Sequence, residues 1–585
     1  MKIKHYFGLA VIAAMTASCS SNEDLGTAGS GTGTNEAGVG YATFTINLPT
    51  TSGTRADAGG AEMNEGSPEE YTVKSATALI FQKYGSDEGS YKFVESVTLP
   101  IDGWTDDTTP GITTTSKKLV AKLTNVDTKN DYSVLILLNN TKVALPTVGQ
   151  SYNDWNSKNI LTLSATDWAG SDGFYMANAP LKGSAASPAT LVPIDKGKIY
   201  ASEAKAKEDA SECAATVFVE RGVAKMTVAT PGTTGTIIVK DKANPTADTK
   251  SEVTFSKWAL DITNKKTFAV HNINGLKSDF GDIWKTDPSN RFIGTNNRVY
   301  WGKDPNYDNK DLKLTDKDAE RQAEFNFITL TSEINKDFTN ATITNPVYCL
   351  ENTFNLENMY QGQTTRVIFK ATYTPKDDAG NPLADAADGT FYTIGNMTTI
   401  LNTDKLKAAV NAVATPVLPT GYTIDYENLK TEGSHVIKAE YIKDASGMVL
   451  DATATYSGTK TGAQIVKEIN DKLGLTDGAG RAEAMVGINT YLNGVTYYIA
   501  RVKHFGALTD WHSGESYSDN NAKYLGRYGM LRNNWYELQV GNVYGPGYPG
   551  VPPVDPTLPD DENEKYLSVS VKILSWAKRS DTVDL

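Results

Sequence analysis

The stretch YATFTINLPTTSGTRADAGG, residues 41–60, joins a strand pattern to a loop pattern. In its first half apolar residues alternate with polar ones, which places Ala42, Phe44, Ile46 and Leu48 on one face of a strand. Its second half is rich in Thr, Ser and Gly and carries Arg55. Exposed loops of this composition are preferred sites of proteolysis. The stretch therefore predicts a strand of the fold followed at once by a loop that is cut after Arg55.

An export signal precedes this strand. Lys2 and Lys4 come before an apolar run from Phe7 to about Met15, which is too short to cross a membrane as a helix. The sequence TASC that ends at Cys19 is similar to a lipobox, in which the thiol is acylated and the Cys becomes the new N-terminus. An ordinary signal peptide that happens to contain a Cys is the alternative. The polar stretch 20–40 favours the lipoprotein, because it has the composition of a flexible tether.

Composition predicts an exported chain with a folded body of two or three domains. The chain has 585 residues, of which 39% are hydrophobic, and no later apolar run is long enough to span a bilayer. The chain has a net charge of -13 and no basic segment, which argues against nucleic acid as a partner. Cys213 and Cys349 remain after Cys19, and the sequence fits either one disulfide or two buried free thiols.

The body of the chain reads mainly as β-strands. Period-two alternation or short β-branched and aromatic runs predict strands in 72–84, 91–99, 117–123, 132–140, 215–229, 364–373 and 533–540. Helical spacing of apolar residues occurs in 402–414 and 460–474. Such a pattern indicates β-sandwiches with a few short helices. The segment TPGTTG, residues 230–235, is the predicted boundary between two of them.

The end of the chain carries a second strand with one apolar face. Residues 545–564 are rich in Pro, Gly and acidic residues, which predicts an extended and poorly packed arm. Beyond it Leu567, Val569, Val571 and Ile573 alternate with polar residues, and Trp576 follows. This strand either folds back and completes its own domain or reaches a second molecule. If the cut after Arg55 frees the first strand, an apolar groove is left, and the last strand of another copy has the right pattern to fill it. Head-to-tail insertion of this kind builds a filament.

Several segments of the chain resemble the Bacteroidales fimbrilins of the type V pilus class, in particular the shaft (major) subunit of the short, or minor, fimbriae. The resemblance is carried, in chain order, by TASC, GTRADAGG, FVERGVAKMTV at 218–228, YCLENTF at 348–354, LRNNWYELQVGNV at 531–543 and the Pro- and Asp-rich arm before KYLSVSVKILSW. It implies two transthyretin-like β-sandwich domains and an extended C-terminal donor-strand arm. It also implies a lipoprotein precursor that an arginine-specific protease activates and that polymerises by strand exchange.

Carried over to this chain, the resemblance divides it into five parts. These are a lipoprotein signal peptide at 1–18, a tether and strand propeptide at 19–55, an N-terminal domain at 56–230, a C-terminal domain at 231–544, and the arm with the donor strand at 545–585. Cys19 is the lipidated residue and Arg55 and Ala56 flank the cut. Ala42, Phe44, Ile46 and Leu48 form the displaced strand, and Leu567, Val569, Val571, Ile573 and Trp576 form the donor. The expected partners are further copies of the chain, tip and anchor subunits, the protease, the outer membrane through the lipid, and host or bacterial adhesion ligands.

Nothing in the sequence predicts catalysis or a cofactor. The five histidines are scattered and none falls in a metal-spaced motif. Asp304, Asn306 and Asp308 have the first spacings of a calcium loop, but the sixth-position Gly and the twelfth-position Glu are missing, so a polar surface loop is the stronger interpretation. Trp301, Trp511 and Trp535 are expected in a core more than on a sugar-binding surface. The predicted function is thus a fimbrial structural subunit at the cell surface. The alternatives are a monomeric, surface-anchored glycan- or protein-binding lipoprotein and a tip or anchor subunit.

Overall fold

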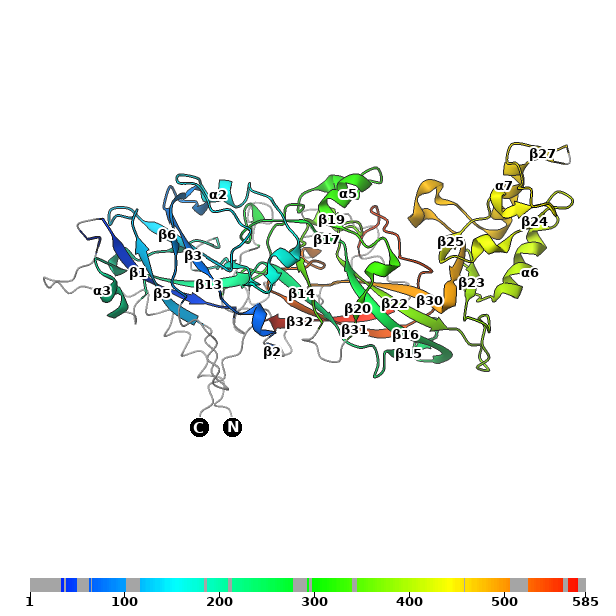
Figure 1. The fold of residues 1–585 in the computed structure, drawn as a ribbon, viewed down its shortest axis with the longest axis horizontal. Helices are drawn as coiled ribbons and strands as arrows, with labels where there is room; N and C mark the ends of the chain where they lie inside the picture. The colour runs from blue at the N-terminus through cyan, green and yellow to red at the C-terminus, as the bar shows by residue number, and fades with distance from the viewer. Residues whose placement is uncertain are drawn as a thin grey trace.

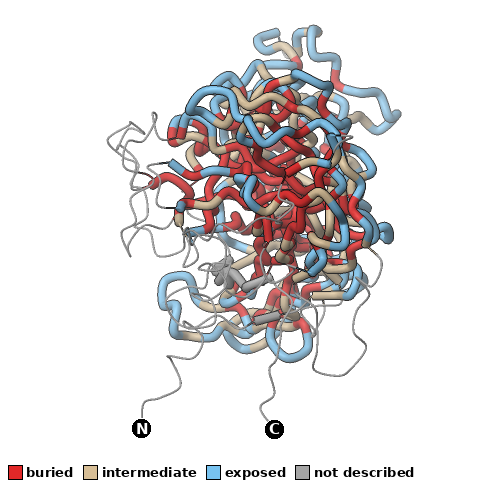
Figure 2. The backbone as a smooth tube through the Cα atoms, turned by 90° about the vertical axis from the view of Figure 1, so that its left-hand side faces the viewer, coloured by how far each residue is buried: buried red, intermediate tan, exposed pale blue. Residues whose placement is uncertain are grey.

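The computed structural model is an elongated, mainly β molecule (Figure 1). The residues that the structure describes are 33–35, 38–49, 63–64, 66–101, 116–183, 187–208, 213–276, 283, 292–293, 297–338, 345–456, 458–504, 524–560 and 567–576. Buried residues gather along the interior and exposed residues cover the outside (Figure 2). The first sheet, a pair of further sheets and a helical lobe follow one another along the long axis.

The first sheet holds the N-terminal strands and occupies the left-hand end of Figure 1. Its order is β12-β1-β13-β10-β6-β3-β4, with β5 added on β1 and β11 on β6. The members are β1 (Gly40–Asn47), β3 (Ala76–Gln82), β4 (Lys92–Thr98), β5 (Ser116–Leu123), β6 (Tyr132–Leu138), β10 (Met176–Asn178), β11 (Val192–Pro193), β12 (Ile199–Tyr200) and β13 (Ala215–Arg221). Side chains from these strands form one hydrophobic core. The central β6 is buried at every position, as its continuous apolar sequence YSVLILL requires.

Two further sheets face each other across a second core. One has the order β2-β32-β31-β14-β21 and the other β15-β16-β22-β30, with β20 on β16. The second sheet contains β2 (Met63–Asn64), β14 (Val223–Val228), β21 (Val347–Leu350), β31 (Trp535–Val543) and β32 (Leu567–Trp576). The third contains β15 (Thr236–Lys240), β16 (Asp248–Asp261), β20 (Lys336–Asp337), β22 (Arg366–Thr374) and β30 (Val495–Arg501). Met226 and Leu538 from the second sheet pack with Phe255 and Phe369 from the third, so the pair forms a sandwich.

A helical lobe lies at the right-hand end of Figure 1. It combines α6 (Thr403–Ala414) and α7 (Gly462–Leu473) with β23 (Phe391–Ile394), β25 (Gly433–His435) and β29 (Ile488–Tyr491) around a core of its own. Both helices were predicted from apolar spacing and are confirmed, with Leu406, Val410, Ile465 and Ile469 buried. A capping box at Thr461 begins α7.

Short elements connect these bodies. They are α2 (Tyr152–Trp155), α3 (Glu203–Glu208) and α5 (Asp318–Glu324), and the strand pairs β7 (Leu161–Thr162) with β18 (Lys266–Thr267), β8 (Ala169–Gly170) with β9 (Gly173–Phe174), β17 (Thr263–Asn264) with β19 (Phe325–Asn326), β24 (Thr423–Ile424) with β26 (Ile442–Lys443), and β27 (Thr455–Tyr456) with β28 (Lys460–Thr461).

One predicted strand is divided in the structure. The apolar stretch 215–229 forms β13 in the first sheet and β14 in the second, with Gly222 between them. A Cβ atom at Gly222 would lie 2.5 Å from the ring of Trp168 and 3.0 Å from that of Tyr175, so this position admits only glycine without rearrangement. The chain changes sheet here, upstream of the predicted boundary at 230–235, and the five-part division of the chain remains a prediction.

The C-terminal arm is extended but well packed, so the expectation of poor packing is wrong. Tyr548 exchanges two backbone hydrogen bonds with Tyr497 of β30, at 2.9 and 2.7 Å. Arg366 donates to the carbonyl of Pro552 at 2.7 Å. Asp560 is 1% exposed and accepts from the Thr364 hydroxyl at 3.0 Å. Residues 545–560 therefore lie along the third sheet as part of the fold.

Candidate functional site

The predicted displaced strand, β1, is hydrogen-bonded on both edges. It runs antiparallel to β5 over all eight residues, from Gly40 opposite Leu123 to Asn47 opposite Ser116. On its other edge Tyr41 and Ala42 pair with β12, and Phe44 to Asn47 run parallel to β13. In the part of the chain that the structure describes, β1 is the one strand with which β5 pairs. Removal of β1 would therefore leave two unpaired strand edges facing each other.

Both faces of β1 are covered. Ala42, Phe44 and Ile46 are 0% exposed and Leu48 is 2% exposed, all within the core of the first sheet. On the opposite face the hydroxyl of Thr43 donates to the carbonyl of Ala206 in α3, at 2.8 Å. Burial of Phe44, Ile46 and Leu48 is worth about 1.5–3 kcal/mol for each side chain. An uncut β1 is thus held as a regular core strand.

Cys19, Arg55 and Ala56 lie outside the described residues. The chain between β1 and β2 includes the predicted cut, so the structure gives no geometry for lipidation or cleavage. Both events remain predictions.

The predicted donor strand, β32, pairs with β31 of its own chain. The antiparallel register places Val569, Val571 and Ile573 opposite Val540, Leu538 and Tyr536. Residues directly opposite in an antiparallel pair share a face of the sheet. Val540, Leu538 and Tyr536 of β31 are themselves buried in the second core.

The two predicted strands are not brought together within this chain. β1 is an interior strand of the first sheet, whereas β32 lies in the second sheet between β31 and β2. β2 runs parallel to the end of β32, with Met63 opposite Ser575 and Asn64 opposite Trp576. This arrangement matches the alternative in which the last strand completes its own sandwich, and exchange between copies remains a prediction.

Buried charges join the first sheet to the second, and the sequence did not predict them. Glu70 ends the short 3-10 helix Pro68–Glu70 and is 0% exposed. Its carboxylate accepts from Lys225 Nζ at 2.6 Å and from the Tyr348 hydroxyl at 2.5 Å. The guanidinium of Arg221 donates to the Glu70 carbonyl at 2.7 Å. Burial lowers the pKa of Lys225 to about 8, although the neighbouring Glu70 opposes this shift.

A second cluster surrounds Glu220. His271 Nδ1 lies 2.9 Å from Oε1 of Glu220, and Arg298 forms an ion pair with the same carboxylate. Arg532 pairs with Glu351 at 3.1 Å in the same region. Burial alone would raise the pKa of Glu220, but His271 and Arg298 outweigh it and lower that pKa to about 2.

Several residues of the two clusters come from motifs that carry the resemblance. FVERGVAKMTV supplies Glu220, Arg221 and Lys225, and RNNWYEL supplies Arg532 and Trp535. Trp535 is fully buried, and the Lys225 ammonium lies over its ring, 3.6 Å from the ring centroid. The signal that could have revealed the cluster is the occurrence of charged residues inside otherwise apolar strands, because such residues are buried only when paired.

Among the other residues considered in the sequence, the described ones at the calcium-like spacing and the described tryptophans show no binding site. Asp304 accepts from the backbone N–H groups of Asn306 and Thr353 and from the Asn264 amide, and burial raises its pKa to about 7. Asp308 is exposed, but Asp304 and Asn306 are buried, so the expectation of a polar surface loop is wrong for these two residues. Within the described ranges no group of three or more His, Cys, Asp or Glu residues could hold a metal ion. Trp301 is fully buried, as Trp535 is, whereas Trp511 lies outside the described residues.

Cys213 and Cys349 are both buried and free of a disulfide in this structure. Burial raises the pKa of the Cys349 thiol to about 12, which keeps it protonated and unreactive. Among the described helices none has the length and apolar character needed to cross a membrane.

Comparison with known proteins points to fimbriae. Residues 489–582, which include β30, β31, the arm and β32, match the family of the major fimbrial subunit protein type IV, fimbrillin, C-terminal. This match supports a role as a fimbrial subunit. Among curated protein sequences no match is found.

Three solved structures match this chain at low similarity. The tip fimbrial protein Mfa3 from Porphyromonas gingivalis, with a C-terminal truncation, is 10% identical, with a TM-score of 0.29, and the alignment covers 92% of this chain and 100% of that one. A protein from Parabacteroides distasonis that is provisionally assigned to cell adhesion is 10% identical, with a TM-score of 0.36 and coverage of 92% and 97%. A fimbrial assembly protein from the same organism is 12% identical, with a TM-score of 0.23 and coverage of 62% and 93%.

Proposed function

We propose that this chain is the shaft subunit of a cell-surface fimbria. It is exported as a lipoprotein precursor anchored through Cys19, cut after Arg55, and polymerised when β1 is replaced by β32 of a neighbouring copy. The assembled fimbria supports adhesion to host or bacterial ligands. Tip and anchor subunits occupy the two ends of the fimbria. The chain acts as a structural subunit and not as an enzyme.

The observation that carries the proposal is the position of β1. A strand whose apolar side chains are fully buried, and whose two edges are both paired, leads directly toward the predicted cleavage loop. A cut in that loop leaves β1 attached only by noncovalent contacts. The groove between β5 and β13 then accepts a strand with the same alternation of apolar and polar residues, which β32 has.

Matching lengths support this exchange. β1 has eight residues and β32 has ten, so the donor can pair along the whole of β5. An incoming strand with the direction of β1 would be antiparallel to β5 and parallel to β13, as β1 is. A head-to-tail contact of this kind does not close on itself and therefore grows into a fibre.

The proposal is tested on precursor that lacks the signal peptide. Wild type, Arg55→Ala and a chain truncated before Lys565 are treated with an arginine-specific protease, and the new N-terminus and the polymer size are measured. We expect wild type to begin at Ala56 and to form SDS-resistant ladders, whereas both altered chains stay monomeric.

Arg481→Ala is the matched control, because Arg481 is an arginine in an exposed position, with a side chain that is 42% exposed. This variant should be cut and should polymerise as wild type does. If wild type is cut after Arg55 and remains monomeric, or is not cut there at all, the chain is instead a monomeric surface-anchored binding lipoprotein.

A further inference from the structure

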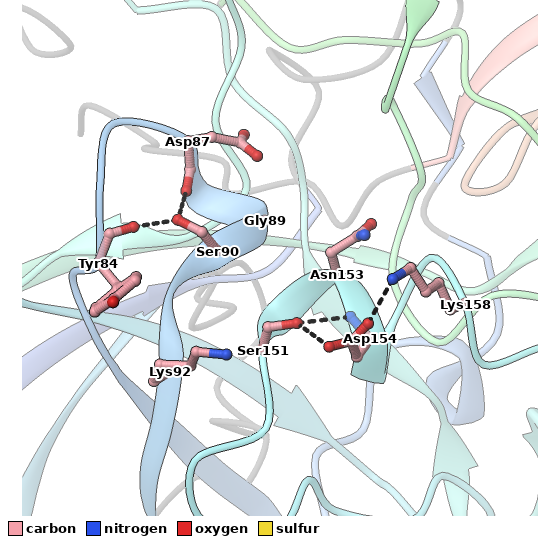
Figure 3. A pocket seen from close by; sticks show the side chains of 9 residues that line it. All are labelled: Tyr84, Asp87, Gly89, Ser90, Lys92, Ser151, Asn153, Asp154 and Lys158. Carbon is pink, nitrogen blue, oxygen red and sulfur yellow. Dashed lines mark hydrogen bonds and ion pairs between the residues drawn. The ribbon is translucent and has the colours of Figure 1, made fainter.

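A polar pocket opens on the first sheet, away from β1 and β32. It has a volume of about 300 Å³, at the lower end of the range for small-molecule sites. Tyr84 and Asp87 line one side, from the loop between β3 and β4, and Asn153 and Asp154 of α2 line the other (Figure 3). Gly89 and Lys92 lie between the two sides.

The frame of the pocket is fixed by backbone hydrogen bonds. The N–H of Phe93 donates to the Gln150 carbonyl and the N–H of Tyr152 donates to the Tyr91 carbonyl, both at 2.9 Å. Below the frame, Phe81 packs edge-on against the ring of Tyr152, with centroids 5.7 Å apart. A binding site built on such a frame loses little conformational entropy when a ligand enters.

Several groups in the pocket are available to a ligand. Tyr84 is 65% exposed. Within the described residues, the Asp87 carboxylate and the Lys92 ammonium form no hydrogen bond or ion pair, and Asn153 uses its oxygen toward Asn274 but not its NH₂ group. Asp154 is already bonded to Lys158, at 2.8 Å, and to Ser151, at 2.6 Å. The pocket thus offers one aromatic face, an acceptor and two donors.

We propose that this pocket binds a neutral hexose-type carbohydrate. Sugar hydroxyls both donate and accept hydrogen bonds, which suits the carboxylate, amide and ammonium groups present. The apolar C–H face of a sugar ring packs against an exposed aromatic side chain. Two carboxylates, Asp87 and Asp154, balance the two ammonium groups of Lys92 and Lys158, so the pocket carries no net charge that would select an acidic ligand.

The position of the pocket suits an adhesive role, and this step rests on the proposed fimbrial function. α2 lies on the upper side of the molecule in Figure 1, whereas β2 and β32 run along the lower side. Strand exchange through β1 and β32 would therefore leave the pocket on the outside of a rod, where it is repeated once in every subunit.

The test uses uncleaved, monomeric chain, so that it does not depend on assembly. The chain is applied to an array of immobilised glycans that includes galactose-, mannose- and N-acetylglucosamine-terminated neutral oligosaccharides together with sialylated and sulfated ones. We expect binding to at least one neutral glycan. Tyr84→Ala and Asp87→Asn should each weaken this binding roughly tenfold, which corresponds to the loss of one good contact.

Two controls separate the pocket from the surface as a whole. Val148→Ala removes another exposed apolar side chain of the same half, and Asp378→Asn removes an exposed carboxylate in the other half. Both should bind as wild type does. Gly89→Ala should weaken binding, because its Cβ would lie 3.0 Å from Asp87 Oδ2 and 3.3 Å from the Cβ of Asn153, so the Asp87 carboxylate has to move. Binding to acidic glycans alone, no binding, or binding that Tyr84→Ala leaves unchanged would overturn the assignment, and none of these outcomes bears on polymerisation.

Discussion

Buried ion pairs hold the first and second sheets together, and in each pair one charge needs the other to be stable. Glu70 and Lys225 have fully buried side chains and lie 2.6 Å apart. Removal of one member of such a pair leaves the other charge without compensation in an apolar surrounding. The segment that carries Glu70 follows the predicted cut, so cleavage leaves this joint in place.

Glu70→Ala is accordingly expected to destabilise the chain strongly. The free energy of unfolding should fall by about 3–5 kcal/mol, because Lys225 and Tyr348 both lose their partner. Urea denaturation monitored by Trp fluorescence measures the change. Glu427→Ala is the control, since it removes an exposed ion pair with Lys430 that is worth about 0–1 kcal/mol. Equal effects of the two substitutions would show that the buried pair does not hold the joint.

Glu220 makes the free energy of unfolding depend on pH in the acidic range. Its pKa is lowered from 4.5 to about 2 in the folded chain, so the unfolded chain binds the proton more readily. The contribution of Glu220 is therefore complete above pH 4.5 and is lost as the pH falls toward 2, with a total on the order of 3 kcal/mol.

The comparison of wild type with Glu220→Gln isolates this contribution. The advantage of wild type in free energy of unfolding should be largest near pH 6 and should shrink steadily between pH 4.5 and pH 2. Urea titrations at four pH values across this range measure it. An advantage that stays constant with pH would contradict the assigned role of His271 and Arg298.

At the level of residues, the sequence predicted the apolar face of β1 but not the charged clusters. Ala42, Phe44, Ile46 and Leu48 follow from local alternation alone, and all four are buried. Glu70, Lys225 and Tyr348 are far apart in sequence, so their meeting depends on the topology of the sheets. Pairwise ion contacts of this kind leave no periodic signal in a single sequence.

At the level of elements, Gly222 decides where the chain leaves the first sheet. It separates β13 from β14, and its Cα faces the stacked rings of Trp168 and Tyr175. Gly222→Ala should cost about 1–3 kcal/mol, because the added methyl group forces these rings to move. Thermal or urea unfolding measures the loss. Gly183→Ala should be neutral, because no atom of the described residues lies within 4 Å of the added Cβ.

Elements with local signals were predictable and those with nonlocal causes were not. α6 and α7 follow from apolar spacing and from the caps Asn402 and Thr461, which are all local features. The stretch 215–229 is rich in β-branched and apolar residues on both sides of Gly222, and periodicity alone cannot show that its two halves pair in different sheets. The collision that fixes Gly222 involves Trp168, which is distant in sequence.

At the scale of the whole molecule, composition predicted the conformation of the C-terminal arm but not its packing. Its Pro and Gly content predicted an extended chain, which is confirmed for residues 545–560. Composition did not reveal that Tyr497, Thr364 and Arg366 provide hydrogen-bond partners along its path. An arm that is fixed in this way holds β32 close to β31. The proposed strand exchange therefore requires β32 to leave a defined place in its own sheet.

A reversible disulfide between β31 and β32 tests whether β32 must leave β31 before the chain can polymerise. Gln539 of β31 lies directly opposite Ser570 of β32. Opposed residues of antiparallel strands have Cβ atoms about 4.5–5.5 Å apart, so a disulfide can join them after a small adjustment. Gln539→Cys with Ser570→Cys should form this disulfide under oxidising conditions, while Cys213 and Cys349 stay buried and unreactive.

The oxidised double variant should still be cut after Arg55, because the disulfide is far from that loop in sequence, but it should remain monomeric. Addition of dithiothreitol breaks the bond without changing a side chain, so the reduced protein is its own control and should polymerise at the rate of wild type. Polymer length is followed by SDS electrophoresis without heating. If the oxidised chain polymerises as fast as the reduced one, β32 does not leave β31, and the donor must be sought elsewhere in the chain.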